Sequence, residues 1–397
     1  MKKKILFVMS SLRGGGAERG LVNLLSLFDF ERYEVDLILL QQEGFLLKQL
    51  PPEVNLISDC EDLHTLYRTS LKKMFSFKYP ALSLKHIVYT LTSKLAVEGA
   101  SKSRQYRWKR FYRKIIKKLN KPYDVGIAYM HCEPIYFLVD KVKADIKIGW
   151  IHNDYSQLEY NHAMDLRYFK KLDKLVSISD ICVEALRKTF PSQRSKLYML
   201  PNLTSSETVK AMAEEFIPEE FKTKKLKLLS IGRLDVQKGF DIAIDAASIL
   251  KKHGIDFIWC IIGKGSIKKE LENQIKSLGL EKSFFLLGTK ENPYPFIKRS
   301  DIVVQTSRFE GKSVVIDEAK ILAKPIVVTR YSTVFDQINE KEGIIVELNA
   351  AAVAEGIERM LTDSEAYIKY LSENKYGNQD KISEYYKLFD CTSEEKL

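Results

Sequence analysis

The sequence is poor in the residues that mark secreted, zinc-binding or membrane-spanning proteins. Its five cysteines among 397 residues are scattered and include no CxxC pair, so they indicate neither a disulfide framework nor a zinc site. No stretch offers the ~18 uncharged apolar residues that a membrane-spanning helix needs. The apolar run near the amino terminus, residues 5–9, is too short for a secretion signal. These absences favour a protein of the reducing cytoplasm.

Several catalytic signatures are also missing. The sequence contains no DxD pair, no HExxH and no GxSxG, and its six histidines are scattered. We therefore expect neither a metal centre nor a serine nucleophile.

Length and composition are those of an ordinary globular protein with two domains. A chain of 397 residues is too long for one hydrophobic core. Its 45% of hydrophobic and 29% of charged residues argue against disorder. The charge is uneven, because residues 68–121 hold sixteen Lys or Arg and one acid, Glu98, in a chain of net charge +11.

Short β-branched runs alternate with helical patterns along the chain, as in parallel strands that are covered on both faces. The first half predicts strands at residues 5–10, 35–40, 123–130, 146–152 and 174–179. After a turn-rich break at 200–209, further strands are predicted at 226–232, 257–263, 283–288, 301–307, 325–329 and 343–348. Helices are expected at 17–28, 181–190, 240–252, 267–278 and 313–323. This pattern predicts two doubly wound α/β domains, with ligands at the carboxyl ends of the strands and in the cleft between the domains.

The segment "SSLRGGGAERG", residues 10–20, joins the first strand to the first helix through three consecutive glycines. Glycines at this place let backbone N–H groups approach an anion at the helix N-terminus. The alternative is a tight turn without a ligand. A dinucleotide site is disfavoured, because the spacing is not GxGxxG.

The segment "IGRLDVQKGFD", residues 231–241, places Arg233 and Lys238 after the first strand of the second domain. Two cations at a strand end are suited to a diphosphate and to the negative charge that it gains as a leaving group. The alternative is a pair of solvated surface cations.

The segment "FEGKSVVIDEA", residues 309–319, contains two acids that are eight residues apart. Glu310 is expected in the loop after a strand and Glu318 on the following helix, so they are not an i,i+4 pair. Free N–H groups of Lys312, Ser313 and Val314 would point at an anion. Glu310 would then meet a hydroxyl-rich group and Glu318 a diol. The alternative is a helix start with chance acids.

His152 is the one histidine that closes a predicted strand where a cleft should lie. This position favours a role in the site. A structural role is the alternative.

Together the glycine-rich first loop, "GRLDVQKGFD", "IIGKGS" and "FEGKSVVIDEA" resemble the glycosyltransferases of family 4. The resemblance spans nearly the whole chain, is strongest from residue 226 to 346 and is weak from 59 to 121. It implies the GT-B fold, in which two Rossmann-like domains face each other across a cleft. It also implies transfer with retention of the anomeric configuration, without a metal, a cofactor or an enzymic nucleophile.

The family motifs assign roles to particular residues. Gly15 and Gly16 would approach the donor phosphate or the acceptor. Arg233 and Lys238 would bind the diphosphate of a UDP- or GDP-linked sugar. His152 matches the strand-end histidine that lies near the transferred sugar in the family.

The resemblance also makes Glu310 a contact of the donor sugar and Glu318 a contact of the ribose. Further donor contacts are expected from neighbouring loops: Gly263, Thr289, Lys290, Gly311, Lys312, Ser313 and Val314. Many family members carry an apolar residue and then Gly or Pro where this chain has Lys312 and Ser313. The identity of the donor sugar is therefore open.

The expected domains are an acceptor-binding domain at residues 1–200, with a basic segment at 65–121, and a donor-binding domain at 201–375. Residues 376–397 should form a last helix that returns to the first domain and couples the two during closure.

Within the basic segment, residues 101–121 hold ten cations, four aromatics and no acid, which is typical of a helix at a membrane surface. The residues expected to contact lipid are Arg104, Arg107, Trp108, Lys109, Arg110, Arg113 and Lys114. A solvated helix is the alternative. Nucleic-acid binding is disfavoured, because no nucleic-acid module surrounds the segment.

We therefore expect an enzyme of bacterial surface polysaccharide synthesis, peripheral on the cytoplasmic face of the cell membrane. Its partners would be a nucleotide sugar, a saccharide or lipid-linked saccharide acceptor and an anionic leaflet, and not a nucleic acid. The alternatives are a GT-B nucleotide-sugar epimerase or phosphorylase, a sugar-binding subunit without activity, and a basic nucleic-acid-binding protein.

Overall fold

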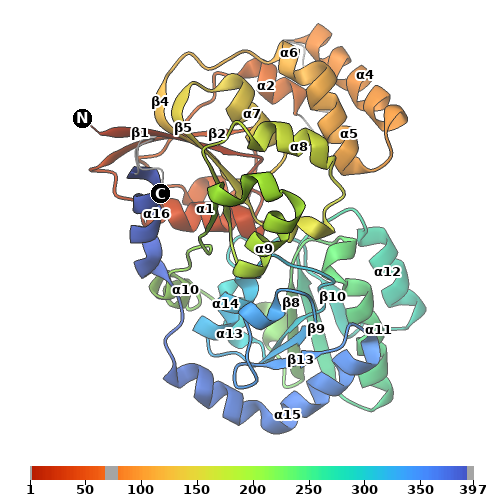
Figure 1. Cartoon of the computed structure of the whole chain (residues 1–397). Coiled ribbons are helices and arrows are strands. Elements are labelled where there is room, and N and C mark those ends of the chain that lie inside the picture. The colour runs from red at the N-terminus through yellow and green to blue at the C-terminus, as the bar shows by residue number, and fades with distance from the viewer. Residues whose placement is uncertain (1, 68–78, 391–397) are drawn as a thin grey trace. The chain divides into compact units, whose positions relative to one another are not determined.

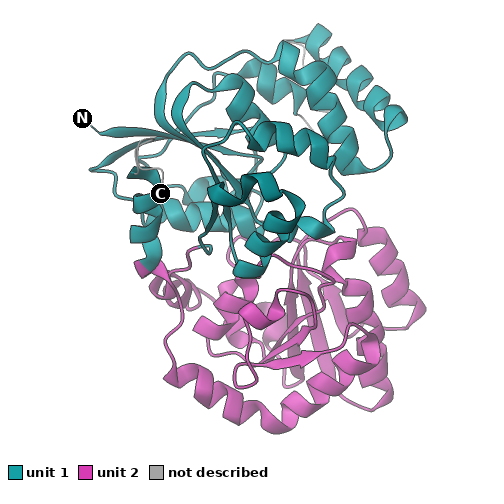
Figure 2. Cartoon of the chain, in the orientation of Figure 1, with its two compact units in different colours: residues 1–202, 381–397 teal, residues 203–380 magenta. Residues whose placement is uncertain are grey.

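The computed structural model describes residues 2–67 and 79–390. Residues 68–78 of the basic segment and residues 391–397 of the carboxyl-terminal segment lie outside the described residues. The chain forms two compact units (Figure 2). Unit 1 contains Met1–Asn202 with Lys381–Leu397, and unit 2 contains Leu203–Asp380. The predicted boundaries lie at residues 200 and 375.

Unit 1 is built on a seven-stranded parallel sheet with the order β3-β2-β1-β4-β5-β6-β7 (Figure 1). Five strands confirm the predicted runs: β1 (Lys3–Met9), β2 (Tyr33–Leu39), β4 (Tyr123–Ala128), β5 (Ala144–Ile151) and β6 (Lys174–Ser177). Two short edge strands were not predicted: β3 (Asn55–Leu56) and β7 (Leu197–Met199). The strand order reverses between β1 and β4, so their carboxyl ends flank the crevice where this topology binds ligands.

Unit 2 is built on a six-stranded parallel sheet with the order β10-β9-β8-β11-β12-β13. All six predicted strands are confirmed: β8 (Leu226–Ile231), β9 (Phe257–Ile262), β10 (Phe284–Leu286), β11 (Ile302–Gln305), β12 (Ile326–Thr329) and β13 (Ile344–Val346). Here the order reverses between β8 and β11. The loops after these two strands therefore open on the same crevice.

Burial on both faces explains why the strands of unit 2 are continuously apolar. In β9 the side chains of residues 257, 259 and 261 join one core cluster, which includes residues of α11 (Phe240–Lys252) and α15 (Ala350–Glu373). The side chains of residues 258, 260 and 262 join a second cluster, which includes residues of α13 (Tyr294–Arg299) and α14 (Val314–Ile321). A strand with helices on both faces has no polar side.

The remaining helices confirm the predictions near 17–28, 181–190 and 267–278 and add elements that were not predicted. Those of unit 1 are α1 (Gly16–Ser26), α2 (Glu61–Leu66), α4 (Pro80–Ala96), α5 (Ala100–Arg107), α6 (Arg113–Ile115), α7 (Glu133–Lys141), α8 (His162–Phe169), α9 (Asp180–Thr189) and α16 (Ile382–Asp390). Those of unit 2 are α10 (Ser206–Met212) and α12 (Lys268–Ser277). A π-helical turn, η2 (Trp108–Tyr112), connects α5 to α6.

Short 3₁₀ turns complete the chain: η1 (Phe45–Gln49), η3 (Tyr155–Gln157), η4 (Pro191–Lys196), η5 (Glu219–Phe221), η6 (Val236–Lys238), η7 (Val334–Asp336) and η8 (Gln379–Lys381). No helix in the described part of the chain combines the length and the apolar character needed to cross a membrane.

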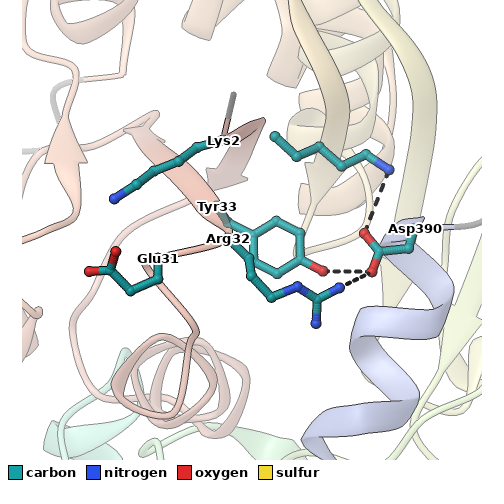
Figure 3. Close-up of a pocket in the computed structure, with 6 residues that line it drawn as sticks. Lys2, Glu31, Arg32, Tyr33 and Asp390 are labelled. Carbon is teal, nitrogen blue, oxygen red and sulfur yellow. Dashed lines mark hydrogen bonds and ion pairs between the residues drawn. The ribbon is translucent and has the colours of Figure 1, made fainter.

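The last helix, α16, is anchored in unit 1 through Tyr385 and through its last residue, Asp390. The Tyr385 hydroxyl donates to the carbonyl of Pro201 at 2.7 Å. The Asp390 carboxylate accepts from the Tyr33 hydroxyl at 2.8 Å and from the Arg32 guanidinium at 2.7 Å (Figure 3). A hollow of about 490 Å³ lies beside this cluster. It lies at the amino ends of β1 and β2, whereas ligands of this topology bind at the carboxyl ends.

Candidate functional site

The topology of unit 2 brings Lys238 and Glu310 into direct contact. Lys238 follows β8 and Glu310 follows β11, the two strands that flank the crevice. The Lys238 ammonium donates to Glu310 Oε1 at 2.5 Å, and the Ser307 hydroxyl donates to the same oxygen at 2.6 Å. The side chains of the pair are 16% and 8% exposed. Lys238, which is predicted to bind the diphosphate, and Glu310, which is predicted to contact the sugar, therefore form one nearly buried ion pair.

A glycine allows the two loops to come this close. Gly239 has φ +63°, and a Cβ there would lie 2.1 Å from the carbonyl oxygen of Thr306. The Thr306 hydroxyl in turn donates to the carbonyl of Lys238 at 3.0 Å. Any larger residue at 239 would separate the loops and move the Lys238 side chain away from Glu310.

Further bonds between the loops involve residues that the sequence analysis did not identify. The Gln237 amide donates to the carbonyl of Phe309 at 2.9 Å. The Arg308 guanidinium makes a two-bond contact with the Asp241 carboxylate, at 2.9 and 2.6 Å. Arg308 holds the pKa of Asp241 below its usual value through these bonds. The loops after β8 and β11 are thus connected before any ligand binds.

Two other cations of the region are less constrained. The Arg233 side chain is 63% exposed, and its Nε lies 3.1 Å from Asp235 Oδ2. Its Nη2 donates to Gln237 Oε1 at 3.1 Å. Lys312 is partly exposed, and its ammonium makes no hydrogen bond or ion pair with any residue that the structure describes. Arg233 and Lys312 are therefore less constrained than Lys238 and are accessible to an anion.

The start of α14 differs from the prediction. The N–H of Ser313 donates to Gln337 Oε1 at 2.9 Å, and the Gln337 amide donates to the carbonyl of Ser313 at 2.5 Å. The Ser313 hydroxyl donates to Gln305 Oε1 at 2.6 Å. The prediction that the Ser313 N–H is free for an anion is therefore wrong in this structure, because a distant glutamine binds it.

Glu318 lies on α14 and is completely buried, with 0% of its surface exposed. Val314, at the start of the same helix, is 5% exposed. A ribose hydroxyl is about as large as water and can contact Glu318 only after a neighbouring group moves. The predicted role of Glu318 therefore requires a rearrangement, whereas Glu310 lies in the loop that opens on the crevice.

The loops after β9 and β10 also meet at this edge of the sheet. The N–H of Gly263 donates to the carbonyl of Gly288 at 2.9 Å. A Cβ at Gly263 would lie 1.7 Å from the carbonyl oxygen of Gly232, so only glycine fits there. Thr289 is exposed, and the Lys290 ammonium lies 3.1 Å from Glu220 Oε1. The Lys290 charge is thus balanced by an acid outside these loops.

The glycine-rich loop of unit 1 binds an internal carboxylate. The N–H of Gly15 donates to Glu18 Oε2 at 2.7 Å, and the Ser11 hydroxyl donates to Glu18 Oε1 at 2.5 Å. Gly14 has φ +104°, and a Cβ there would lie 2.5 Å from the Phe45 ring. Gly16 is the first residue of α1. Glu18 therefore takes the place at the start of α1 that the sequence predicts for an external anion.

His152 follows β5 and is 6% exposed. Its Nε2 lies 3.1 Å from the carbonyl oxygen of Tyr129. A carbonyl only accepts, so Nε2 carries the proton and Nδ1 is an acceptor. Nδ1 is buried and has no hydrogen-bond partner among the described residues. Burial lowers the pKa of His152 to about 3, so the ring is neutral and can accept from a hydroxyl group.

Only part of the basic segment is exposed on the surface of the protein. Trp108 is fully buried, and its indole N–H lies 3.1 Å from both Asp140 Oδ2 and the Tyr168 hydroxyl. The prediction that Trp108 anchors the protein in a membrane is therefore wrong. The π-helical turn that begins at Trp108 brings both Trp108 and Tyr112 into the core of unit 1.

Two of the cationic side chains predicted to contact the membrane make hydrogen bonds within the protein instead. Arg104 Nε donates to Glu133 Oε2 at 2.6 Å, and Arg107 donates to the Thr90 hydroxyl at 3.2 Å. The other four predicted cations are exposed: Lys109, Arg110, Arg113 and Lys114. Two of these, Lys109 and Arg113, line a hollow of about 110 Å³ together with Arg167 and Lys171.

Residues 212–379 match the family of glycosyl transferases group 1. Solved structures match over nearly the whole chain. Anabaena HepE in complex with UDP-glucose is 17% identical with a TM-score of 0.66, over 96% of this chain and 94% of that one. Staphylococcus aureus TarM in complex with UDP is 16% identical with a TM-score of 0.67, over 98% and 100% of the chains.

The chain has the GT-B fold. A full-length relative of this GT-B chain comes from Campylobacter jejuni: an N-acetylgalactosamine-N,N'-diacetylbacillosaminyl-diphospho-undecaprenol 4-alpha-N-acetylgalactosaminyltransferase. It is 26% identical over 384 residues, which are 94% of each chain. The poly(ribitol-phosphate) alpha-N-acetylglucosaminyltransferase of S. aureus is 31% identical over 110 residues, 28% of this chain and 22% of that one. These matches support a glycosyltransferase.

The family match of this GT-B chain covers all the candidate donor residues of unit 2, from Arg233 to Glu318. Within the described residues, no group of three or more His, Cys, Asp or Glu side chains is placed to hold a metal ion.

Proposed function

We propose that this protein is a retaining family 4 glycosyltransferase that needs no metal and transfers a sugar from a UDP- or GDP-linked donor to a saccharide acceptor. The contact between Lys238 and Glu310 at the crevice of unit 2 carries the proposal. The solved relatives with UDP and UDP-glucose support a nucleotide-sugar donor. The predicted roles of Arg233, Lys238, Glu310 and His152 are part of the proposal.

The ion pair suggests how donor binding and catalysis are connected. Before the donor binds, the Lys238 charge is balanced by Glu310 at 2.5 Å. A diphosphate competes for the same ammonium, and its arrival leaves the Glu310 carboxylate able to accept hydrogen bonds from the sugar hydroxyls. Lys238 exchanges one anionic partner for another and never remains unpaired, which keeps the cost of the exchange low.

The leaving group sets the electrostatic requirement. When the bond between the anomeric carbon and the phosphate oxygen breaks, its electron pair remains on the diphosphate. Lys238 and the exposed Arg233 supply positive charge at that place. In the retaining mechanism of the family, the acceptor oxygen attacks from the same face and its proton passes to the departing phosphate oxygen. No side chain then needs to act as a nucleophile.

We further propose a lipid-linked saccharide acceptor and a peripheral position on the cytoplasmic face of a bacterial membrane. The name of the C. jejuni relative specifies an acceptor on diphospho-undecaprenol. The exposed cations Lys109, Arg110, Arg113 and Lys114 are suited to an anionic leaflet. Unit 1 would bind the acceptor in this proposal, and unit 2 the donor.

The central test is a panel of UDP- and GDP-sugars, measured for thermal stabilisation and for slow hydrolysis of the donor. One nucleotide class should stabilise the protein, and Arg233→Ala and Glu310→Ala should weaken the stabilisation or the hydrolysis. Lys252→Ala is the matched control, because Lys252 is an exposed cation of unit 2 at the far end of α11. If no nucleotide diphosphate binds, the proposed function is wrong.

Two further measurements test retention of the anomeric configuration and independence of a metal ion separately. The anomeric configuration of the product, read from proton coupling constants, should equal that of the donor, and inversion would contradict a retaining enzyme. Activity should persist after treatment with EDTA, and a loss that Mg²⁺ or Mn²⁺ restores would contradict metal independence.

A further inference from the structure

The helix α4 turns an apolar face toward solvent. Leu84, Val88, Leu91 and Leu95 are 59%, 48%, 58% and 89% exposed. Their spacing of four, three and four residues places them along one side of the helix. Among the residues that the structure describes, no other helix has more than two large apolar side chains that are at least 40% exposed. We call these four side chains the apolar stripe.

The fully buried side chains of α4 are polar, while its apolar Leu82 and Tyr89 are only partly buried against the core of unit 1. Ser83, His86 and Ser93 are 1%, 7% and 0% exposed. His86 Nδ1 lies 2.7 Å from the Tyr112 hydroxyl, and the Ser103 hydroxyl donates to the Ser93 hydroxyl at 3.0 Å. A helix that only covers a core turns its apolar side inward, because burial of apolar surface drives folding. Because α4 instead leaves the four side chains of the stripe in solvent, the stripe indicates an interaction outside the chain.

The helices around the stripe are strongly cationic. α4 packs along α5 (Figure 1), and ring contacts add to this, because the Tyr89 ring stacks on Phe111 with 4.0 Å between the centroids. Residues 80–118 contain one acid, Glu98. They also contain nine exposed cations: Lys85, Lys94, Lys102, Lys109, Arg110, Arg113, Lys114, Lys117 and Lys118. A partner for this surface must therefore combine an apolar layer with negative charge.

We propose that α4 lies in the plane of an anionic phospholipid surface, with the apolar stripe among the acyl chains and the cations of α4 to α6 against the phosphates. A bilayer surface offers these two chemistries in adjacent layers. From Leu84 to Leu95 the stripe is about 16 Å long, the length of a shallow in-plane contact. A second copy of the chain fits less well, because it would bring like charges together.

This inference rests on the peripheral location in the proposed function and names the surface responsible for it. It also replaces Trp108, which is buried, by α4 as the apolar anchor. The cations Lys109, Arg110, Arg113 and Lys114 keep their predicted partner, now beside the stripe.

The first test is co-sedimentation with phosphatidylcholine vesicles, with and without phosphatidylglycerol. The protein should bind the anionic vesicles, and the double substitution Leu91→Ser, Leu95→Ser should weaken binding roughly tenfold or more, since two inserted leucines are lost. The control is Leu361→Ser, Ile368→Ser on α15, where both side chains are 42% exposed. Equal binding of the stripe variant and the unmodified protein would overturn the proposal.

The second test measures insertion directly. The three native tryptophans are 0% exposed, so a new exposed tryptophan can be followed by fluorescence. Leu91→Trp should show a blue-shifted emission with anionic vesicles and quenching by brominated lipid. Leu361→Trp is the control and should show neither. An unshifted Leu91→Trp emission with bound vesicles would exclude insertion of the stripe.

A third measurement addresses a protein partner for the stripe. Light scattering without lipid should give the same mass for the unmodified protein and for the Leu91→Ser, Leu95→Ser variant. A dimer that the variant abolishes would overturn the proposal in favour of self-association. UDP binding should be unchanged in this variant. Failure of the unmodified protein to bind either UDP or GDP would refute the proposed function and leave the vesicle result standing.

Discussion

The contact between Lys238 and Glu310 allows a quantitative prediction for the substitution Lys238→Met. The methionine keeps most of the length of the lysine but removes the ammonium. Glu310, with a side chain that is 8% exposed, then keeps the Ser307 bond of 2.6 Å and loses its cation. Removing one partner of a buried ion pair costs about 3–5 kcal/mol. We expect about 3 kcal/mol, the lower limit, because Lys238 is 16% exposed.

The same substitution should weaken binding of a nucleoside diphosphate. A hydrogen bond to a charged group contributes about 1.5–3 kcal/mol, which corresponds to a roughly 10- to 100-fold higher Kd. Glu310→Gln should weaken nucleotide binding less than Lys238→Met does, because it removes the carboxylate that competes with the diphosphate for the Lys238 ammonium. The double substitution Lys238→Met, Glu310→Gln should recover about 2 kcal/mol of the stability lost by Lys238→Met, since no buried charge then lacks a partner.

Stability must be measured in unit 2, because a chain of two units need not unfold in one step. Trp259 is the one tryptophan of unit 2 in the sequence, and its indole N–H donates to the Ser230 hydroxyl at 3.0 Å. Urea unfolding followed by ¹⁹F NMR of 5-fluorotryptophan therefore reports on unit 2 through its own signal. Calorimetry gives the Kd for UDP and GDP. If Lys238→Met unfolds at the same urea concentration as the unmodified protein and binds the nucleotide equally well, the reasoning about the pair is refuted.

Three further predictions concern other residues. The folded-state pKa of His152 is about 3, below its unfolded value of about 6.5, so its stabilising effect is present above pH 6.5 and is lost as the pH falls toward 3. The stability difference between the unmodified protein and His152→Asn should therefore change by about 2 kcal/mol between pH 7 and pH 5, and a constant difference in urea unfolding would contradict this. Lys312→Ala should raise the donor KM by a factor of about 5, which corresponds to a surface charge interaction of about 1 kcal/mol; an unchanged KM would exclude a role in donor binding. Trp108→Phe should lower the free energy of unfolding by about 2 kcal/mol, because it removes the indole hydrogen bonds in the core, and should leave vesicle binding unchanged; weaker vesicle binding by a folded variant would restore Trp108 as an anchor.

The sequence alone was sufficient for the fold class, two doubly wound α/β domains. Parallel strands with helices on both faces must be apolar on both sides, so they appear as short continuous runs. Eleven of the thirteen strands in the described residues were predicted in this way. The edge strands β3 and β7 were missed because two or three residues carry no pattern. The sequence also placed Arg233, Lys238 and Glu310 after strands, and the order of the sheet makes those strand ends neighbours.

Only the tertiary structure decided which groups bind each other. The partner of the Ser313 N–H is Gln337, which lies 24 residues away and carries no local signal. The Glu18 carboxylate binds the N–H of Gly15 at the start of α1, where the sequence predicts an external anion. Gly239 is required because the carbonyl of Thr306 lies against it. The orientation of a helix is decided in the same way. Trp108 is buried and Leu95 is exposed, because the face that turns inward depends on the surface the helix packs against as well as on its own hydrophobic pattern.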